Sequence, residues 1–297
     1  MDPTDAILME GLAKSYGSVQ ALRGVNLQVR CGEIFGFLGP NGAGKTTTIR
    51  CLLDLIRPDG GTTRVLGINP QEDPVAVRAR VGYLPGELHM DENMTVEAVL
   101  RYLNALRRGK ADWDYVLRLA ERMNLNLKTA IKHLSKGNKQ KAGIIQALMH
   151  RPELLMLDEP TFGLDPLMQQ EVLHLVSEAR DEGATVFFSS HILSEVQDIS
   201  DRVGIIRLGE VVQVAETSLI IKQAFRRAKV RFQKEVDPQL LAHLPGVTLL
   251  SQDDGMNVRL QVEGEMDDLI KALAQYPVSD FETEHPSLEE IFLAYYR

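Results

Sequence analysis

The sequence predicts an α/β fold with a mostly parallel sheet, followed by a small α+β domain of ferredoxin-like order. Short apolar runs alternate with segments of helical periodicity up to about residue 214, which is the order of a parallel α/β core. Beyond residue 217 the elements become shorter and follow a βαββαβ order. We therefore expect two domains, at residues 1–216 and 217–297, and the chain length of 297 residues favours the same number.

Three kinds of local structure are predicted before residue 150. Apolar and polar positions alternate from Ile7 to Val29 around a turn at Gly17, which is typical of a small antiparallel β subdomain. The apolar run 33–38 is a strand that leads into a glycine-rich loop, and helical spacing follows at Ile49, Leu52, Leu53 and Ile56. Helical periodicity then dominates from Thr95 to Met149, so we expect a helical subdomain over about residues 88–150.

Strands and helices continue to alternate after this insertion. The core is completed by a strand at 154–157, a helix at 167–182 and a strand at 185–189. In the second domain we expect strands near residues 229–232, 247–250, 256–262 and 278–282, and helices near residues 238–243, 265–274 and 287–296. The final helix is either part of that domain's own core or a dimer contact.

Composition and charge exclude several classes of protein. The net charge of −8 disfavours nucleic acid as a partner. No apolar run approaches the roughly 18 residues of a membrane-spanning helix, and residues 1–5 lack the basic and apolar parts of a secretory signal. We expect a chain that does not cross a membrane and stays in the cytoplasm. We expect its cysteines, Cys31 and Cys51, to be reduced, buried thiols.

The glycine-rich loop has the complete sequence of a P-loop. Gly39, Gly42 and Gly44 leave the backbone amides accessible, and the following helix directs its N-terminal amides at an anion. In such a loop we expect Lys45 to reach the terminal phosphate oxygens, and the Thr46 hydroxyl can be a ligand for Mg²⁺. The alternative is a glycine-rich turn with a structural role only. The residues that we expect to contact ATP here are Gly39, Pro40, Asn41, Gly42, Ala43, Gly44, Lys45, Thr46 and Thr47.

Two adjacent acids end the apolar strand that follows the helical subdomain. Asp158 is then placed at the carboxyl edge of the sheet, where a carboxylate can hold Mg²⁺, and Glu159 is placed to polarise the attacking water. By itself this pattern also fits an ordinary strand end before Pro160. The P-loop upstream favours the catalytic interpretation.

Four further segments resemble the motifs of one known protein family. Residues 134–138, Leu-Ser-Lys-Gly-Asn, resemble the signature of the ATP-binding cassette (ABC) ATPases. Residues 161–165 resemble the loop after that family's catalytic glutamate, and residues 189–191 resemble its switch-histidine strand end. Tyr16 matches the aromatic residue that stacks on adenine. Over about residues 5–215 the chain resembles an ABC ATPase core, and its end resembles ATPases of bacterial drug and antibiotic exporters that have separate membrane permeases.

This resemblance implies roles for individual residues. Glu159, His191 and Lys45 are the expected catalytic residues, with His191 hydrogen-bonded to the γ-phosphate. Ser135 and Gly137 are expected to face ATP that is bound by a second copy, so that ATP joins a head-to-tail pair. Each role has a simpler alternative: Ser135 caps a helix, His191 is structural, and Tyr16 is an ordinary sheet aromatic.

Two positions depart from the pattern of the family. Gly86 stands where a glutamine usually touches Mg²⁺, and Glu87 after it is a candidate to take part of that role. The signature has Lys136 and Asn138 where glycine and glutamine are typical. The expected metal ligands are therefore Thr46, Asp158 and Glu87.

The resemblance also implies partners and a location. We expect a homodimer or pseudo-dimer of ATPase subunits, held by an integral membrane permease at the cytoplasmic side of the cell membrane, that powers export of a drug, antibiotic or lipid-like substrate. The rivals are an ABC protein that acts in DNA repair or on the ribosome, and a module that binds ATP as a switch without turnover. The first predicts a coiled coil or a second cassette, and the intact acid pair disfavours the second.

Overall fold

The computed structural model describes residues 5–109, 111–219, 226–237 and 239–284. Contacts between residues divide the chain into two compact units, Met1–Ala215 and Glu216–Arg297. From the sequence we placed this boundary after residue 216. Within the described ranges, no helix combines the length and the hydropathy that a membrane crossing requires.

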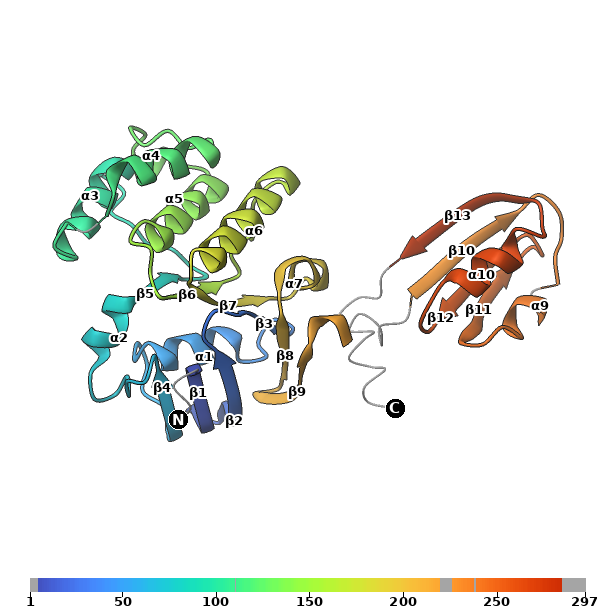
Figure 1. The fold of residues 1–297 in the computed structure, drawn as a ribbon, viewed down its shortest axis with the longest axis horizontal. Coiled ribbons are helices and arrows are strands. Elements are labelled where there is room, and N and C mark those ends of the chain that lie inside the picture. The colour runs from blue at the N-terminus through green and yellow to red at the C-terminus, as the bar shows by residue number, and fades with distance from the viewer. Residues whose placement is uncertain (1–4, 110, 220–225, 238, 285–297) are drawn as a thin grey trace. The chain divides into compact units, whose positions relative to one another are not determined.

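The centre of the first unit is a six-stranded sheet in the order β5-β6-β7-β3-β8-β9 (Figure 1). Its pairs β5–β6, β6–β7, β7–β3 and β3–β8 are parallel, so β3, β6 and β7 end at the same edge. Burial on both faces explains why these strands read as continuous apolar runs. The predicted mostly parallel core is confirmed. The strands are β3 (Ile34–Leu38), β5 (Val81–Leu84), β6 (Leu154–Asp158), β7 (Thr185–Ser190), β8 (Arg202–Arg207) and β9 (Glu210–Glu216).

A second, antiparallel sheet has the order β2-β1-β4 and consists of β1 (Asp5–Tyr16), β2 (Val19–Arg30) and β4 (Gly60–Val65). Helix α1 (Lys45–Leu52) lies between the two sheets (Figure 1). The buried ring of Phe187 packs against Phe35 and Phe37 of the neighbouring strand, with centroids 5.9 and 5.2 Å apart. This core fixes the strand that carries the P-loop.

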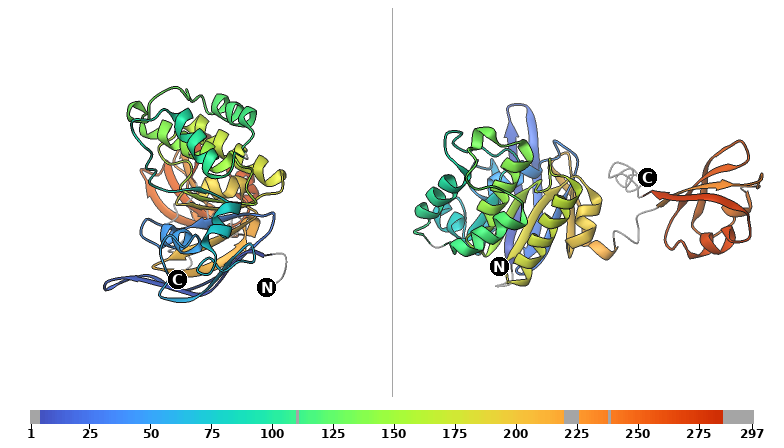
Figure 2. Two further views of the ribbon diagram at one scale, coloured as in Figure 1. Left: turned by 90° about the vertical axis from the view of Figure 1, so that its left-hand side faces the viewer. Right: turned by 90° about the horizontal axis from the view of Figure 1, so that it is seen from above.

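Helices cover the opposite face of the six-stranded sheet (Figures 1 and 2). Four of them begin at an oxygen-bearing side chain that accepts a hydrogen bond from a first-turn amide, at Thr95, Asp112, Ser135 and Asp165. Helices α3 to α5 form the expected helical subdomain. These helices are α3 (Val96–Leu106), α4 (Trp113–Arg122), α5 (Lys136–Leu148), α6 (Pro166–Asp181) and α7 (Leu193–Ile199), with a 3₁₀ turn at Ile131–His133. Helix α2 (Pro74–Arg80) instead packs Val77 into the core that α1 shares.

The prediction of two buried thiols is wrong for one cysteine. Cys51 on α1 is buried, but Cys31 is exposed. Cys31 occupies the tight turn between β2 and β3, where Gly32 has a φ of 77°. We expected Cys31 at the edge of a buried strand, whereas the chain reverses here at the surface.

The second unit is a four-stranded antiparallel sheet in the order β11-β12-β10-β13. Two helices pack on one face through Leu241, Leu269 and Leu273. This topology confirms the ferredoxin-like βαββαβ prediction. The helix predicted near residues 287–296 lies outside the described residues. The elements are β10 (Arg226–Phe232), α9 (Gln239–Ala242), β11 (Val247–Asp253), β12 (Asn257–Val262), α10 (Asp267–Leu273) and β13 (Val278–Glu284).

We expect Phe232→Ala to destabilise the second unit by about 3–5 kcal/mol, because it removes a fully buried ring. Phe232 is 2% exposed and packs edge-on against Tyr276. The single tryptophan, Trp113, lies on α4 of the first unit, so its fluorescence monitors that unit alone. Hydrogen exchange of residues 226–284 should accelerate while the Trp113 unfolding transition stays in place. Equal shifts in both signals would contradict independent stability of the two units.

Candidate functional site

The P-loop connects the end of β3 to the start of α1. Its glycines are required by geometry: Gly42 and Gly44 have φ values of 80° and 114°, and a Cβ on Gly39 would lie 2.4 Å from the backbone oxygen of Ile206. Gly44 is also the N-cap of α1, so no side-chain oxygen occupies the first amides of this helix. These amides remain available for an anion.

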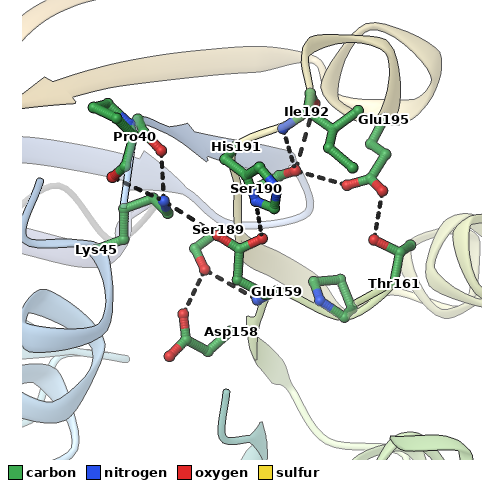
Figure 3. A network of polar contacts seen from close by, with 12 residues as sticks. Pro40, Lys45, Asp158, Glu159, Thr161, Ser189, Ser190, His191, Ile192 and Glu195 are labelled. Carbon is green, nitrogen blue, oxygen red and sulfur yellow. Dashed lines mark hydrogen bonds and ion pairs between the residues drawn. The ribbon is translucent and has the colours of Figure 1, made fainter. Parts of the chain in front are cut away.

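Lys45 is buried at the beginning of α1 and extends back over the loop (Figure 3). Its ammonium donates hydrogen bonds to the carbonyl oxygens of Gly39, at 2.5 Å, and Pro40, at 3.3 Å. It also lies 3.1 Å from Oε1 of Glu159. The Lys45 ammonium therefore contacts both the P-loop and Glu159, which follows β6.

Asp158 is completely buried at the carboxyl end of β6. Each of its oxygens accepts one hydroxyl hydrogen bond: Oδ2 from Thr46 at 2.7 Å and Oδ1 from Ser189 at 2.6 Å. Gly86 lies beside it, and a Cβ at position 86 would be only 3.0 Å from Oδ2 of Asp158. The glycine that departs from the family pattern therefore leaves open the space next to this carboxylate.

Glu159 occupies the left-handed region, with a φ of 52°, which is unfavourable for a residue other than glycine by about 1–2 kcal/mol. The conformation is held by its amide, which donates to the carbonyl and hydroxyl oxygens of Ser189, and by Gln140, which donates to its carbonyl at 3.1 Å. The side chain points back to the P-loop, with Oε2 2.6 Å from Nδ1 of His191 (Figure 3). Strain of this kind is typical of functional sites.

Two adjoining cavities lie around these groups. One of about 330 Å³ is lined by Asn41, Thr46, Arg50, Gly86, Glu87, Asp158, Glu159, Phe162 and His191. A smaller one of about 180 Å³ is lined by Ala21, Pro40, Asn41, Gly42, Gly44, Lys45, Thr46, Thr47 and Glu159. The structure therefore brings together the predicted P-loop, the acid pair and His191, although the P-loop precedes the acid pair by more than a hundred residues in the sequence.

Other predicted residues lie away from these cavities. Tyr16, at the end of β1, is 48% exposed and lines neither of them. Ser135 is exposed at the N-cap of α5, where its hydroxyl accepts a hydrogen bond from the amide of Asn138 at 3.2 Å. Gly137 approaches the neighbouring loop so closely that a Cβ would be 2.9 Å from the oxygen of Gly163. The signature segment thus faces outward, not toward the P-loop of its own chain.

Three supporting residues were missed or given no role by the sequence analysis. Ser189 connects both acids, Gln140 holds the backbone of Glu159, and the buried Glu195 accepts hydrogen bonds from Thr161 and Ser190. A polar residue within an otherwise apolar helix face is the one signal that points to Gln140 and Glu195. It does not reveal which residues they contact.

Comparisons with known proteins agree with this geometry. The family model described as "ABC transporter" matches residues 22–162. The bacitracin transport ATP-binding protein BcrA of Bacillus licheniformis is 38% identical over 81% of this chain and 77% of its own length. The chain belongs to the ABC transporter family. Like other ATP-binding subunits of this family, it binds and hydrolyses ATP.

This ABC ATPase also resembles drug-resistance proteins over nearly its whole length. The daunorubicin/doxorubicin resistance ATP-binding protein DrrA of Streptomyces peucetius is 33% identical over 98% of the chain and 92% of its own. A model described as "ATP-binding protein DrrA1-3-like, C-terminal domain" matches residues 220–296. A solved ATP-binding subunit of an ABC transporter has a TM-score of 0.68 and 30% identity, covering 73% of this chain and 92% of that one. The expected family is confirmed.

Proposed function

We propose that this ABC ATPase powers export of a drug, antibiotic or lipid-like substrate through a separate membrane permease. The observation that carries the proposal is the convergence of Lys45, Asp158, Glu159 and His191 in a chain that is similar, over nearly its full length, to resistance ATP-binding proteins. On this proposal the protein lies at the cytoplasmic side of the cell membrane, held there by the permease.

ATP would occupy the two adjoining cavities. Its β- and γ-phosphates would accept hydrogen bonds from the uncapped amides of α1, and Lys45 would exchange the carbonyls of Gly39 and Pro40 for phosphate oxygens. We assign Tyr16, exposed at the end of β1, to stacking on the adenine ring.

The residues beside the cavities fit Mg²⁺. Thr46 and Asp158 present a hydroxyl and a carboxylate oxygen 2.7 Å apart, and hard oxygen donors are what this ion prefers. When bound, Mg²⁺ neutralises charge on the phosphate oxygens. Among the described side chains of His, Cys, Asp and Glu, no three gather into a metal cluster. Phosphate and water oxygens would therefore supply most of the remaining ligands. Glu87, exposed at the rim of the cavity, stays a candidate for one.

Hydrolysis requires a water molecule aligned with the γ-phosphate. Glu159 is placed to accept a proton from this water, because its carboxylate reaches toward the loop as far as Lys45. His191 contacts Oε2 of Glu159 and lines the cavity, so with both ring nitrogens protonated it could donate to the carboxylate and to the γ-phosphate. Water activation and phosphate sensing would thus be linked through one contact.

The second copy of the protein would complete the site. Ser135 and Gly137 lie at a helix N-terminus and line neither nucleotide cavity of their own chain, and such a terminus favours an anion. We propose a homodimer or pseudo-dimer in which each copy presents Ser135 and Gly137 to the ATP bound by the other.

A groove of about 720 Å³ is the proposed contact for the permease. The walls of the groove are mainly apolar. Residues 85–90 border both this groove and the larger nucleotide cavity. Pro85, Leu88 and Met90 line the groove, while Gly86 and Glu87 line the nucleotide cavity. A permease helix seated there would therefore respond to changes beside Asp158.

Placing a charge in this groove should separate transport from ATPase activity. Tyr102 lines the groove on α3 and is 56% exposed, so Tyr102→Asp is compatible with folding. We expect the affinity for the permease to fall about tenfold or more, because a buried unpaired charge is unfavourable. ATPase activity of the isolated protein should stay within about twofold. Leu117→Asp is the control, because Leu117 is 48% exposed on α4 and lies outside the groove. Normal copurification of a polytopic membrane protein with Tyr102→Asp would contradict this contact.

The overall proposal is tested by expressing the protein with its neighbouring coding sequences and purifying it from the membrane fraction. A polytopic membrane protein should copurify and stimulate ATP hydrolysis. Absence of both would argue for an ABC protein without a transport role.

A further inference from the structure

A buried carboxylate outside the nucleotide cavities joins the two segments that carry Glu159 and His191. Glu195, in the first turn of α7, is 5% exposed. Its Oε1 accepts a hydrogen bond from the hydroxyl of Thr161 at 2.5 Å, and its Oε2 accepts one from Ser190 at 2.6 Å. Thr161 follows Glu159 by two residues and Ser190 immediately precedes His191. The two hydrogen bonds of Glu195, called the Glu195 bridge below, therefore connect the segments that carry the catalytic pair (Figure 3).

The bridge begins where the sheet ends. The last ladder pair between β6 and β7 is Asp158 with Ser189, so Glu159 and His191 lie one and two residues beyond the regular strand pairing. Their side chains meet at 2.6 Å, and Glu159 has a left-handed backbone that would relax if its surroundings loosened. The relative position of the two segments therefore depends on contacts other than the ladder.

Three features make Glu195 suited to hold them. Both hydroxyl partners are buried, with Ser190 0% and Thr161 2% exposed, so neither hydrogen bond is exchanged for water. The Ser190 hydroxyl also accepts from the amide of Ile192, which fixes the turn after His191. Glu195 also lies in the first turn of the helix that follows His191, close to the segment that it holds.

We propose that Glu195 is a positioning residue for ATP hydrolysis, whose carboxylate holds His191 against Glu159 through Ser190 and Thr161. The inference deepens the proposed function and rests on it. Glu195 itself lines neither nucleotide cavity. Its loss should displace catalytic groups without removing any contact with ATP.

The test compares Glu195→Leu with Glu195→Gln in the full-length protein. A displacement on the order of 1 Å at a reacting group lowers rates up to about 10²-fold, so we expect Glu195→Leu to lower kcat by about 10- to 100-fold. The KM for ATP and the ATP dissociation constant should change by less than about threefold. Glu195→Gln keeps one carbonyl acceptor and should recover kcat to within about fivefold of wild type.

A double-mutant cycle with His191→Ala identifies the route of the effect. If Glu195 acts by placing His191, then Glu195→Leu should lower kcat by less than about threefold further in the His191→Ala background. Glu33→Leu is the matched control: Glu33 is 8% exposed, accepts from the amide of Arg30 and pairs with Arg202 at the other end of the sheet. It should lower thermal stability and leave kcat per folded molecule unchanged.

Several outcomes would overturn the inference. Unchanged kcat in Glu195→Leu, equal losses in the two His191 backgrounds, or a loss of kcat in Glu33→Leu of the same size would each do so. If Glu195→Leu does not fold, Thr161→Val and Ser190→Ala remove the two donors separately, and full kcat in both would refute the bridge. A wild-type protein without ATPase activity would instead refute the proposed function, and the inference with it.

Discussion

Glu159→Gln is expected to lower kcat for ATP hydrolysis by about 10²- to 10⁴-fold, the range in which a positioned general base contributes. The carboxamide has the shape of the carboxylate but cannot accept a proton from water. ATP affinity should be equal or higher, because Glu159 lies 3.1 Å from Lys45 and its negative charge opposes the phosphates that Lys45 would bind. Single-turnover hydrolysis and equilibrium ATP binding measure the two effects separately.

A matched control is available at the other end of the same strand. Glu153 precedes β6 at the end opposite to Asp158 and pairs at the surface with Arg80. Glu153→Gln should keep wild-type kcat. A Glu159→Gln protein with full turnover would contradict the assignment of this residue, and a large loss of ATP affinity would indicate a structural role in the P-loop.

The parts of the site that are local in sequence were predictable. Three glycines with a following lysine and threonine specify the P-loop because the backbone geometry itself requires them, as the φ values of Gly42 and Gly44 show. Asp158 was predictable because an apolar strand must end at the edge of its sheet. The ferredoxin-like order followed from short elements with clear periodicity.

The supporting contacts were not predictable, because they form between residues that only the tertiary fold brings together. Glu195 lies 34 residues from Thr161, and Gln140 lies 19 residues from Glu159. Nothing in the sequence near Glu159 indicates its left-handed backbone, which exists because Ser189 and Gln140 hold it. The exposure of Cys31 was missed for a related reason, since a short turn leaves little trace in apolar periodicity.

The outward position of the signature segment means that one chain holds only half of the proposed hydrolytic site. Ser135→Asp should therefore abolish ATP-driven dimerisation in the Glu159→Gln background. Aspartate caps a helix as well as serine does, so α5 should remain intact. Its charge, however, would face the γ-phosphate of the partner, and like charges in an interface weaken binding by several kcal/mol, or about 10²-fold or more. Light scattering with and without ATP measures the change.

Thr95→Asp controls for the chemistry of this substitution. Thr95 caps α3 in the same subdomain by accepting from the amide of Ala98 at 3.2 Å, but it lines neither nucleotide cavity. This variant should dimerise with ATP like its parent. Normal dimerisation of Ser135→Asp would remove the signature segment from the interface.

Complementation tests whether the two halves come from different copies. Ser135→Asp keeps an intact P-loop, and Lys45→Ala keeps an intact signature segment, so each variant alone should be inactive. A mixed dimer contains one complete site, because a two-fold symmetric interface forms the same contact twice. If the variants mix at random and the sites act separately, an equal mixture should recover about a quarter of wild-type ATPase activity. Recovery can arise only if Ser135 serves the ATP of its partner, and an inactive mixture would place both halves of the site within one chain.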